Sequence, residues 1–139
     1  RDPKEIIFSY SKVIKSPKMS DIGVKMQFDL FNYLEKSNSK AIVLDARYLL
    51  ENPEEILKKL CDMIDIPYFE DMLEWERGQK EEDGVWAKYW YDNVHDSTSF
   101  LPYKKKDIQL TKDLKSLYQE CLPYYNFLTE KSIKHDTTI

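Results

Sequence analysis

Apolar residues recur at helical spacing in several segments of the chain, and capping residues mark where helices are expected to begin. At the start of the chain, Asp2 fits an N-cap, Pro3 the first helical position and Glu5 a capping box. The apolar stripe expected to face the core from this helix consists of Ile6, Ile7, Tyr10, Val13 and Ile14. Residues 15–21 are expected to form a loop.

A second helix is expected next, because Ser20 or Asp21 can cap a run of apolar residues at helical spacing. Its apolar stripe consists of Ile22, Met26, Leu30, Tyr33 and Leu34. The polar residues 36–40 are expected to end this helix. Phe28 and Phe31 are interpreted as core residues rather than as the lining of a pocket.

A third helix is expected at Asn52, which fits an N-cap followed by Pro53 and by Glu55 in a capping-box-like pattern. The residues expected to face inward from this helix are Ile56, Leu57, Leu60, Cys61 and Ile64. Pro67 is expected to end the unit, and residues 68–75 fit a further short helix.

A last helix is predicted over residues 110–122. Its apolar stripe consists of Leu114, Leu117, Tyr118 and Cys121. Pro123 is expected to break or kink it, because proline lacks the backbone N–H and clashes with the preceding turn. The polar tail from Lys131 onwards is expected to fray.

Residues 41–46 form a short apolar run that predicts a strand covered on both faces. One strand cannot make a sheet, so we expect the chain to be the C-terminal part of an α/β domain whose sheet lies mostly upstream, with mainly helices in this part. Residues 76–107 show little periodicity and contain several aromatic residues. A loop of this length in a compact domain is usually functional, or else contains elements that the sequence pattern does not reveal.

The composition narrows the possible functions. The 139 residues carry a formal net charge of −4, which argues against a general nucleic-acid binder. No apolar run approaches the ~20 residues that a membrane span needs. Cys61 and Cys121 lie in apolar helical patterns and are interpreted as buried free thiols, which favours a reducing compartment such as the cytoplasm.

The opening of the chain combines groups that can bind an anion. A helix N-terminus presents unpaired N–H groups and a partial positive charge, and Arg1 directly precedes it. Ser9 offers a hydroxyl two turns further along. An exposed arginine and a serine bonded to its own helix backbone explain the same residues without a ligand.

The first twelve residues, "RDPKEIIFSYSK", resemble the 3′-phosphate-binding motif of the sulfotransferases that use 3′-phosphoadenylyl sulfate. The resemblance implies that Arg1 and Ser9 hold the 3′-phosphate of the nucleotide. Residues 41–66 are similar to the strand, loop and helix of that family. Where its cytosolic enzymes carry Tyr-Glu-Asp, with the tyrosine at the adenine, this chain has Ala46, Arg47 and Tyr48.

A later segment, "QKEEDGVWAKYW", is similar to the glycine-rich motif that adds contacts to the same phosphate. The resemblance implies cofactor-binding roles for Lys80, Gly84 and Trp86, with Arg77 as a second candidate cation. Glu81 departs from the motif, where the family has glycine. Trp86 is equally well explained as a residue that pins a long loop to the core. Residues 82–100 resemble a bacterial or protist branch of the family more closely than the animal cytosolic enzymes.

The resemblance implies that residues 1–130 are the C-terminal portion of one P-loop, three-layer α/β/α domain, followed by a polar tail over residues 131–139. The implied reaction transfers a sulfuryl group from 3′-phosphoadenylyl sulfate to a hydroxyl or amine of a small-molecule acceptor, leaving adenosine 3′,5′-bisphosphate. The phosphosulfate-binding loop and the catalytic base are expected upstream of Arg1. Neither a nucleic acid nor a membrane is an expected partner, and an oligomer is possible.

Two other readings stay open at this stage. The chain can be a non-catalytic module that keeps the fold, or a relative of the P-loop small-molecule kinases, which would prefer ATP. His135 lies in the polar tail and is expected to be solvated. Asp92, His95 and Asp96 lie close together in the sequence, but a single histidine with no cysteine nearby is a weak match to a metal site.

Overall fold

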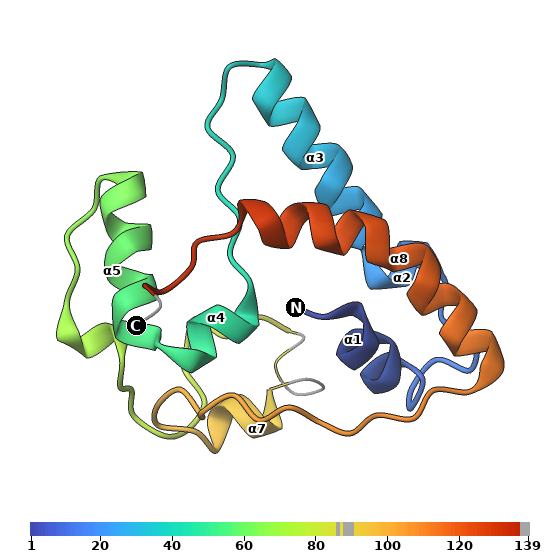
Figure 1. Ribbon diagram of the computed structural model, residues 1–139. Helices are drawn as coiled ribbons and strands as arrows, with labels where there is room; N and C mark the ends of the chain where they lie inside the picture. Colours follow the sequence, from blue (N-terminus) through green and yellow to red (C-terminus); the bar gives the residue numbers. More distant parts are fainter. Residues whose placement is uncertain (86, 88–90, 137–139) are drawn as a thin grey trace.

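The longest helix, α8 (Lys112–Lys131), is the element against which the N-terminal helices pack. The computed structural model describes residues 1–85, 87 and 91–136. Figure 1 shows α8 crossing beside α1 (Pro3–Tyr10), α2 (Met19–Ile22) and α3 (Val24–Lys36). The other elements in chain order are α4 (Ala46–Glu51), α5 (Pro53–Ile64), the 3₁₀ helix η1 (Glu70–Met72) and α7 (Asp92–His95).

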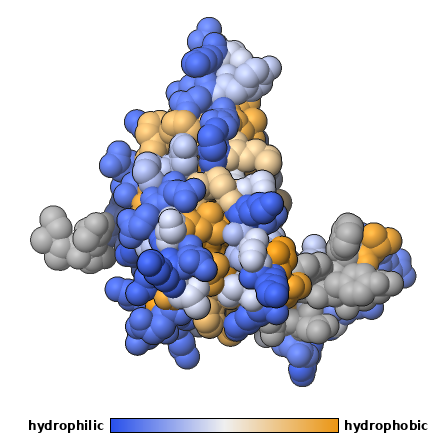
Figure 2. Space-filling model, turned by 90° about the vertical axis from the view of Figure 1, so that its right-hand side faces the viewer, coloured by the Kyte–Doolittle hydropathy of each residue, from blue (hydrophilic) through white to orange (hydrophobic). Residues whose placement is uncertain are grey.

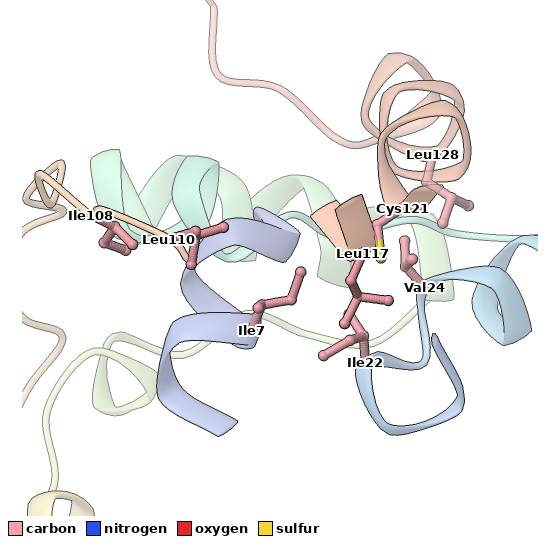
Figure 3. Close-up of a cluster of buried hydrophobic side chains, with 8 residues drawn as sticks. All are labelled: Ile7, Ile22, Val24, Ile108, Leu110, Leu117, Cys121 and Leu128. Atoms are coloured by element: carbon pink, nitrogen blue, oxygen red, sulfur yellow. The ribbon is translucent and has the colours of Figure 1, made fainter. Parts of the chain in front are cut away.

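The main core lies where α1, α2 and α3 meet α8. Ile7 is completely buried and shares one cluster with Leu117 and Cys121 of α8 (Figure 3). The other buried members of this cluster are Ile22, Val24, Ile108, Leu110 and Leu128. Burial of these apolar side chains holds together helices that are about a hundred residues apart in the sequence.

The first helix begins as predicted and ends earlier than predicted. Asp2 accepts a hydrogen bond from the backbone N–H of Lys4 at 2.8 Å, so the N-cap prediction is confirmed. The helix ends at Tyr10, and Val13 is 69% exposed, so its predicted place in the core is wrong. Ser11 donates its hydroxyl to the carbonyl of Phe8 at 2.9 Å, a local bond that competes with continuation of the helix.

The predicted second helix is two helices separated by Gly23. Gly23 has φ +76°, a left-handed conformation that glycine adopts without steric cost. The cap also differs from the prediction, because helix α2 begins after Lys18, whose N–H donates to Asp21 Oδ2 at 2.7 Å. The break shifts the helical phase, so the stripe predicted over residues 22–34 does not face the core as one surface.

The buried face of α3 is the aromatic one. Phe28 packs edge-to-face on Phe127 with ring centroids 5.0 Å apart, and Phe31 does so at 5.5 Å. The prediction that both phenylalanines belong to the core is confirmed. The predicted stripe residues Met26, Leu30 and Tyr33 are more than half exposed, so their assignment to the core is wrong. On the face shown in Figure 2, hydrophobic patches lie among hydrophilic side chains.

Residues 41–45 are extended but form no sheet within the described residues. Val43 makes one isolated parallel bridge to Ser132, in which the N–H of Ile133 donates to the Val43 carbonyl at 2.9 Å. The predicted strand over residues 41–46 is therefore wrong for the described chain, because a strand needs a neighbour along its length. Asp45 instead caps α4, accepting from the N–H of Arg47 at 2.7 Å.

Helix α5 starts at the predicted cap. Asn52 accepts from the N–H of Glu55 at 3.4 Å and donates its amide to the Glu55 carboxylate at 2.7 Å. Ile56 and Cys61 are buried as predicted, whereas Ile64 is 45% exposed and not part of the core. The helix ends at Asp65, in a left-handed conformation, before Pro67 is reached. A short 3₁₀ helix, η1, lies within the segment predicted as a short helix.

Helix α8 continues through Pro123, so of the predicted break or kink the break is wrong. Figure 1 shows that the helix changes direction along its length but stays continuous. Pro123 and Gln119 are both exposed, so the Gln119 carbonyl that loses its helical N–H partner lies on the water-facing side. Water can bond that carbonyl, and the proline costs less there than it would on a buried face.

Residues 132–136, which follow α8, pack against the rest of the structure and do not fray. Ser132 and Ile133 are both 8% exposed. The ammonium of Lys59 on α5 donates to the Lys134 carbonyl and lies near Asp136 Oδ1, both at 2.9 Å. The predicted fraying is therefore wrong for these residues, because contacts far apart in the sequence hold them.

Residues 76–107 contain α7 and several cross-loop contacts. Glu74 and Ser99 form an isolated antiparallel bridge, and Trp75 donates its indole N–H to the Ser97 hydroxyl at 3.1 Å. Trp75 also packs edge-to-face on Phe100, with ring centroids 5.2 Å apart.

In the described part of the chain, none of the helices combines the length and apolar character needed to cross a bilayer.

Candidate functional site

Arg1 directly precedes the first turn of α1, where Pro3 has no backbone N–H, Lys4 donates to Asp2 Oδ1 and Glu5 donates to the Asp2 carbonyl. Its side chain is 49% exposed, and its Nε lies 3.1 Å from Glu5 Oε2. The backbone nitrogen of Arg1 lies 3.5 Å from Oδ2 of the buried Asp45, just before α4. Arg1 therefore lies where the beginning of α1 meets the beginning of α4.

Two adjoining cavities of about 420 and 290 Å³ open beside Arg1, and we call them together the basic pocket. The lining residues that both cavities share are Arg1, Glu5, Leu50 and Tyr103. The larger cavity adds Asp2, Arg47, Glu51, Lys105 and Tyr125, and the smaller adds Leu101, Pro102, Lys104 and Lys106. Five basic and three acidic side chains line the basic pocket, so its balance is positive in a chain of net charge −4.

Tyr103 joins the segment of residues 101–106 to α1 and α4. Its hydroxyl donates to Glu5 Oε1 at 3.2 Å, and its N–H donates to the Leu50 carbonyl at 3.3 Å. Burial raises the pKa of the Tyr103 phenol, and the negative charge of Glu5 adds to this shift. The phenol therefore stays protonated and keeps donating its hydrogen bond at neutral pH.

Arg47 occupies the first turn of α4 on the other side of the pocket. Its Nε donates to Glu51 Oε1 at 2.8 Å, and its guanidinium lies 5.4 Å from the centre of the Tyr48 ring. Burial by itself raises the pKa of Glu51. The hydrogen bonds from Arg47 and His135 outweigh that effect and lower the pKa overall, so the carboxylate is ionised at neutral pH.

The structure does not bring the other predicted cofactor-binding residues into the lining of the basic pocket. Ser9 is exposed on α1, and no cavity described here has Ser9 or Gly84 in its lining. A Cβ added at Gly84 would meet open space, so nothing in the structure requires glycine there. Trp86 lies outside the described residues.

Lys80 and Arg77 are exposed and each contacts a nearby carboxylate. The ammonium of Lys80 lies 3.5 Å from Glu76 Oε2, and its backbone N–H donates to Asp83 Oδ2 at 2.9 Å. The guanidinium of Arg77 donates to Asp96 Oδ1 at 2.7 Å. Neither side chain lines the pocket that contains Arg1.

Both histidines contact carboxylates. His95 Nε2 lies 2.8 Å from Asp83 Oδ2, and His135 Nε2 lies 3.2 Å from Glu51 Oε2. The expectation that His135 is solvated is wrong, because it also packs edge-to-face on Tyr48 with ring centroids 5.9 Å apart. Among the residues described, no group of three or more His, Cys, Asp or Glu side chains is arranged to hold a metal ion.

Of the residues that line the basic pocket, Arg1 alone was predicted from the sequence as a site residue, and Arg47, Tyr103 and Lys105 are among those that were not. In the sequence, Arg47 was noted only because the resembling enzymes carry another residue at that position. Lys105 belongs to the run "KKK" at residues 104–106, which lies within a long stretch without periodicity. A basic run beside an aromatic residue is a recognisable signal for anion binding, but only the fold places it next to Arg1.

A third cavity, of about 370 Å³, is lined mostly by apolar side chains. It lies between α3, the extended residues 41–45 and the second half of α8. Leu30 and Leu44 line it and are 56% and 37% exposed. Arg1 also reaches the edge of this cavity, so the same residue lies between an apolar hollow and the basic pocket.

Comparison with known proteins gives two curated relatives, both from Arabidopsis thaliana. Branched-chain-amino-acid aminotransferase-like proteins 1 and 2 are 34% and 32% identical to this chain over all 139 residues. The chain spans about a quarter of the length of either relative, 25% and 24%. No solved structure matches the chain.

A family model described as "Sulfotransferase domain" matches residues 1–132. The match covers all the described helices and the pocket around Arg1. The chain belongs to the sulfotransferase domain family.

Proposed function

We propose that the protein containing this chain transfers a sulfuryl group from 3′-phosphoadenylyl sulfate to a hydroxyl or amine of a small-molecule acceptor, and that this chain binds the 3′-phosphate of the nucleotide. The observation that carries the proposal is the position of Arg1, which precedes the N-terminus of α1 and lines the basic pocket. A guanidinium in a pocket whose lining is mostly basic suits a phosphate. Membership in the sulfotransferase domain family supports the same reaction.

In this proposal the chain supplies affinity for the nucleotide and its orientation. Arg1 binds the 3′-phosphate in the basic pocket, and the roles that the resemblance implies for Ser9, Lys80, Gly84 and Trp86 stay predictions. Cationic groups also stabilise negative charge that develops on the leaving nucleotide phosphate. The catalytic base and the groups that bind the phosphosulfate belong to residues outside these 139.

We further propose that residues 1–130 are the C-terminal portion of a P-loop, three-layer domain, with residues 131–139 as its tail. The extended residues 41–45 make a single bridge and border an apolar cavity, which leaves room for neighbouring strands. Cys61 and Cys121 are buried free thiols, as predicted, and this supports a reducing location such as the cytoplasm.

The test measures binding of adenosine 3′,5′-bisphosphate and of 5′-AMP to the full-length protein by isothermal titration calorimetry. These ligands differ by the one phosphate assigned to Arg1. The wild type is expected to prefer the bisphosphate, and Arg1→Ala should weaken that binding by about 1.5–3 kcal/mol, the range for a charge-assisted hydrogen bond. Lys25→Ala is the matched control, because it removes an exposed i,i+4 ion pair on α3, away from the pocket. Equal affinity of the wild type for the two ligands would refute the proposed nucleotide site.

A second candidate function is a nucleotide-binding module without sulfuryl transfer. The departures from the resembling enzymes at Ala46, Arg47 and Glu81 favour it. Incubating the full-length protein with 3′-phosphoadenylyl sulfate and a panel of hydroxyl and amine acceptors separates the two functions. Binding without release of the bisphosphate supports the module, and a preference for ATP in the same titrations supports a kinase-like relative.

A further inference from the structure

We propose that Arg47 and Lys105 bind the same phosphate group as Arg1, and that Glu5 and Glu51 are positioning residues that orient the two arginines. This inference rests on the proposed nucleotide-binding function and adds ligand-binding residues that belong to none of the matched motif positions. Arg47 even stands where the resembling enzymes carry an acidic residue, so the charge at that position is reversed in this chain.

The two arginines are held in the same way. Arg1 is the first residue of an i,i+4 pair with Glu5, and Arg47 is the first residue of an i,i+4 pair with Glu51. In each pair the carboxylate contacts Nε, at 3.1 Å in one and 2.8 Å in the other. The terminal Nη nitrogens, which bind phosphate oxygens as a fork, hydrogen-bond to no described residue. Both side chains are about half exposed and line the same cavity.

Lys105 reaches this cavity from a segment that is fixed at both sides. Tyr103 bonds to Glu5 and to the Leu50 backbone, and Ile108 and Leu110 are buried in the main core. Lys105 lies between these anchors and is exposed. It forms no ion pair with a residue described by the structure, so its ammonium is available to a ligand. The hydroxyl of Tyr103 also donates to Glu5 and so fixes the orientation of the carboxylate that contacts Arg1.

The charge and size of the basic pocket suit a phosphate. The larger cavity has about 420 Å³, within the range of about 300–1,000 Å³ typical of small-molecule sites. Glu5 and Glu51 are already engaged with the arginines, while Lys104, Lys105 and Lys106 add positive charge that no described carboxylate neutralises. A phosphate dianion can therefore enter without displacing either ion pair.

The experiment titrates the full-length protein with adenosine 3′,5′-bisphosphate and with 5′-AMP, using Arg47→Gln, Lys105→Gln and Glu51→Gln. Arg47→Gln is expected to weaken binding of the bisphosphate about tenfold or more, because the lost hydrogen bonds are charge-assisted. Binding of 5′-AMP should stay the same. Arg47→Lys keeps the charge without the fork and should recover only part of the affinity. Lys25→Gln is the control, and melting temperatures show that each variant is folded.

The possible outcomes separate this inference from the proposed function. If the wild type prefers the bisphosphate, and Arg1→Ala loses the preference while Arg47→Gln and Lys105→Gln keep it, the inference is overturned and the proposed function stands. If the wild type shows no preference, both are overturned. Should Arg47→Gln fail to fold, Lys105→Gln still decides, because its side chain is exposed and outside any helix. Glu51→Gln alone should weaken binding of the bisphosphate. If Glu51 acts by positioning Arg47, the double variant should bind no more weakly than Arg47→Gln alone.

Discussion

Replacing Ile7 with alanine tests the packing that fixes α1 and therefore the position of Arg1. Ile7 is completely buried and belongs to the cluster that includes Leu117 and Cys121 of α8. Alanine keeps the helix, because it has the highest helix propensity, but removes three carbon atoms from this contact. The variant thus changes the packing of α1 on α8 and leaves the local preference for a helix intact.

The expected loss follows from the burial of Ile7. Three carbon atoms at roughly 0.8 kcal/mol for each buried CH₂ give about 2.4 kcal/mol of lost transfer free energy. The space left behind adds to this, because the surrounding helices relax only in part. We therefore expect Ile7→Ala to lower the free energy of unfolding by about 3–4 kcal/mol, within the ~2–5 kcal/mol known for such replacements.

Urea denaturation followed by circular dichroism measures this loss as a shift of the midpoint at unchanged slope. Val13→Ala is the matched control, because Val13 continues the same apolar stripe in the sequence but is 69% exposed. Its effect should stay within about 0.5 kcal/mol, as for ordinary surface positions. A loss below about 1 kcal/mol for Ile7→Ala, or an equal loss for Val13→Ala, would refute the packing described for α1.

Two further substitutions test the N-cap of α5 and the contacts of Asp83 within residues 76–107. Asn52→Ala removes the N-cap of α5 and should destabilise the protein by about 1 kcal/mol in the same urea experiment, whereas Asn52→Asp should largely preserve the cap. Hydrogen bonds from the backbone N–H of Lys80 and from His95 lower the pKa of Asp83. The ionised carboxylate therefore stabilises the fold above the ordinary pKa of about 4. This contribution is lost as the pH falls through the lowered pKa. The difference in melting temperature between wild type and Asp83→Asn should therefore shrink on going from about pH 6 to about pH 3, and a constant difference would contradict the assigned contacts.

The N-caps of α1 and α5 were predicted correctly because they depend on neighbours along the chain. Asp2 and Asn52 cap helices because their side chains reach N–H groups two or three residues ahead. The stripe over residues 22–34 failed because the left-handed conformation of Gly23 is a single backbone choice that shifts every later side chain. The strand at residues 41–46 failed because pairing depends on a neighbouring strand, and within the described part of the chain Ser132 alone lies alongside.

The same distinction between local and long-range contacts holds for the residues of the candidate site. Arg1 was predicted from its place before a capped helix together with the resemblance of the first twelve residues to the 3′-phosphate motif. Arg47 could not be predicted in this way, because its relation to Arg1 depends on how the beginning of α4 meets the beginning of α1. Lys105 is further away still along the chain, and Tyr103 brings it to the pocket through a bond to Glu5 spanning 98 positions.

The packing of α1 on α8 also has a consequence for biosynthesis. Ile7 leaves the ribosome long before Leu117 and Cys121, the α8 residues that share its cluster. At roughly 5–20 residues per second, translation of the intervening residues takes about 5–20 s, during which Ile7 lacks its partners on α8. The nascent chain thus holds α1 without this part of its core until α8 has emerged.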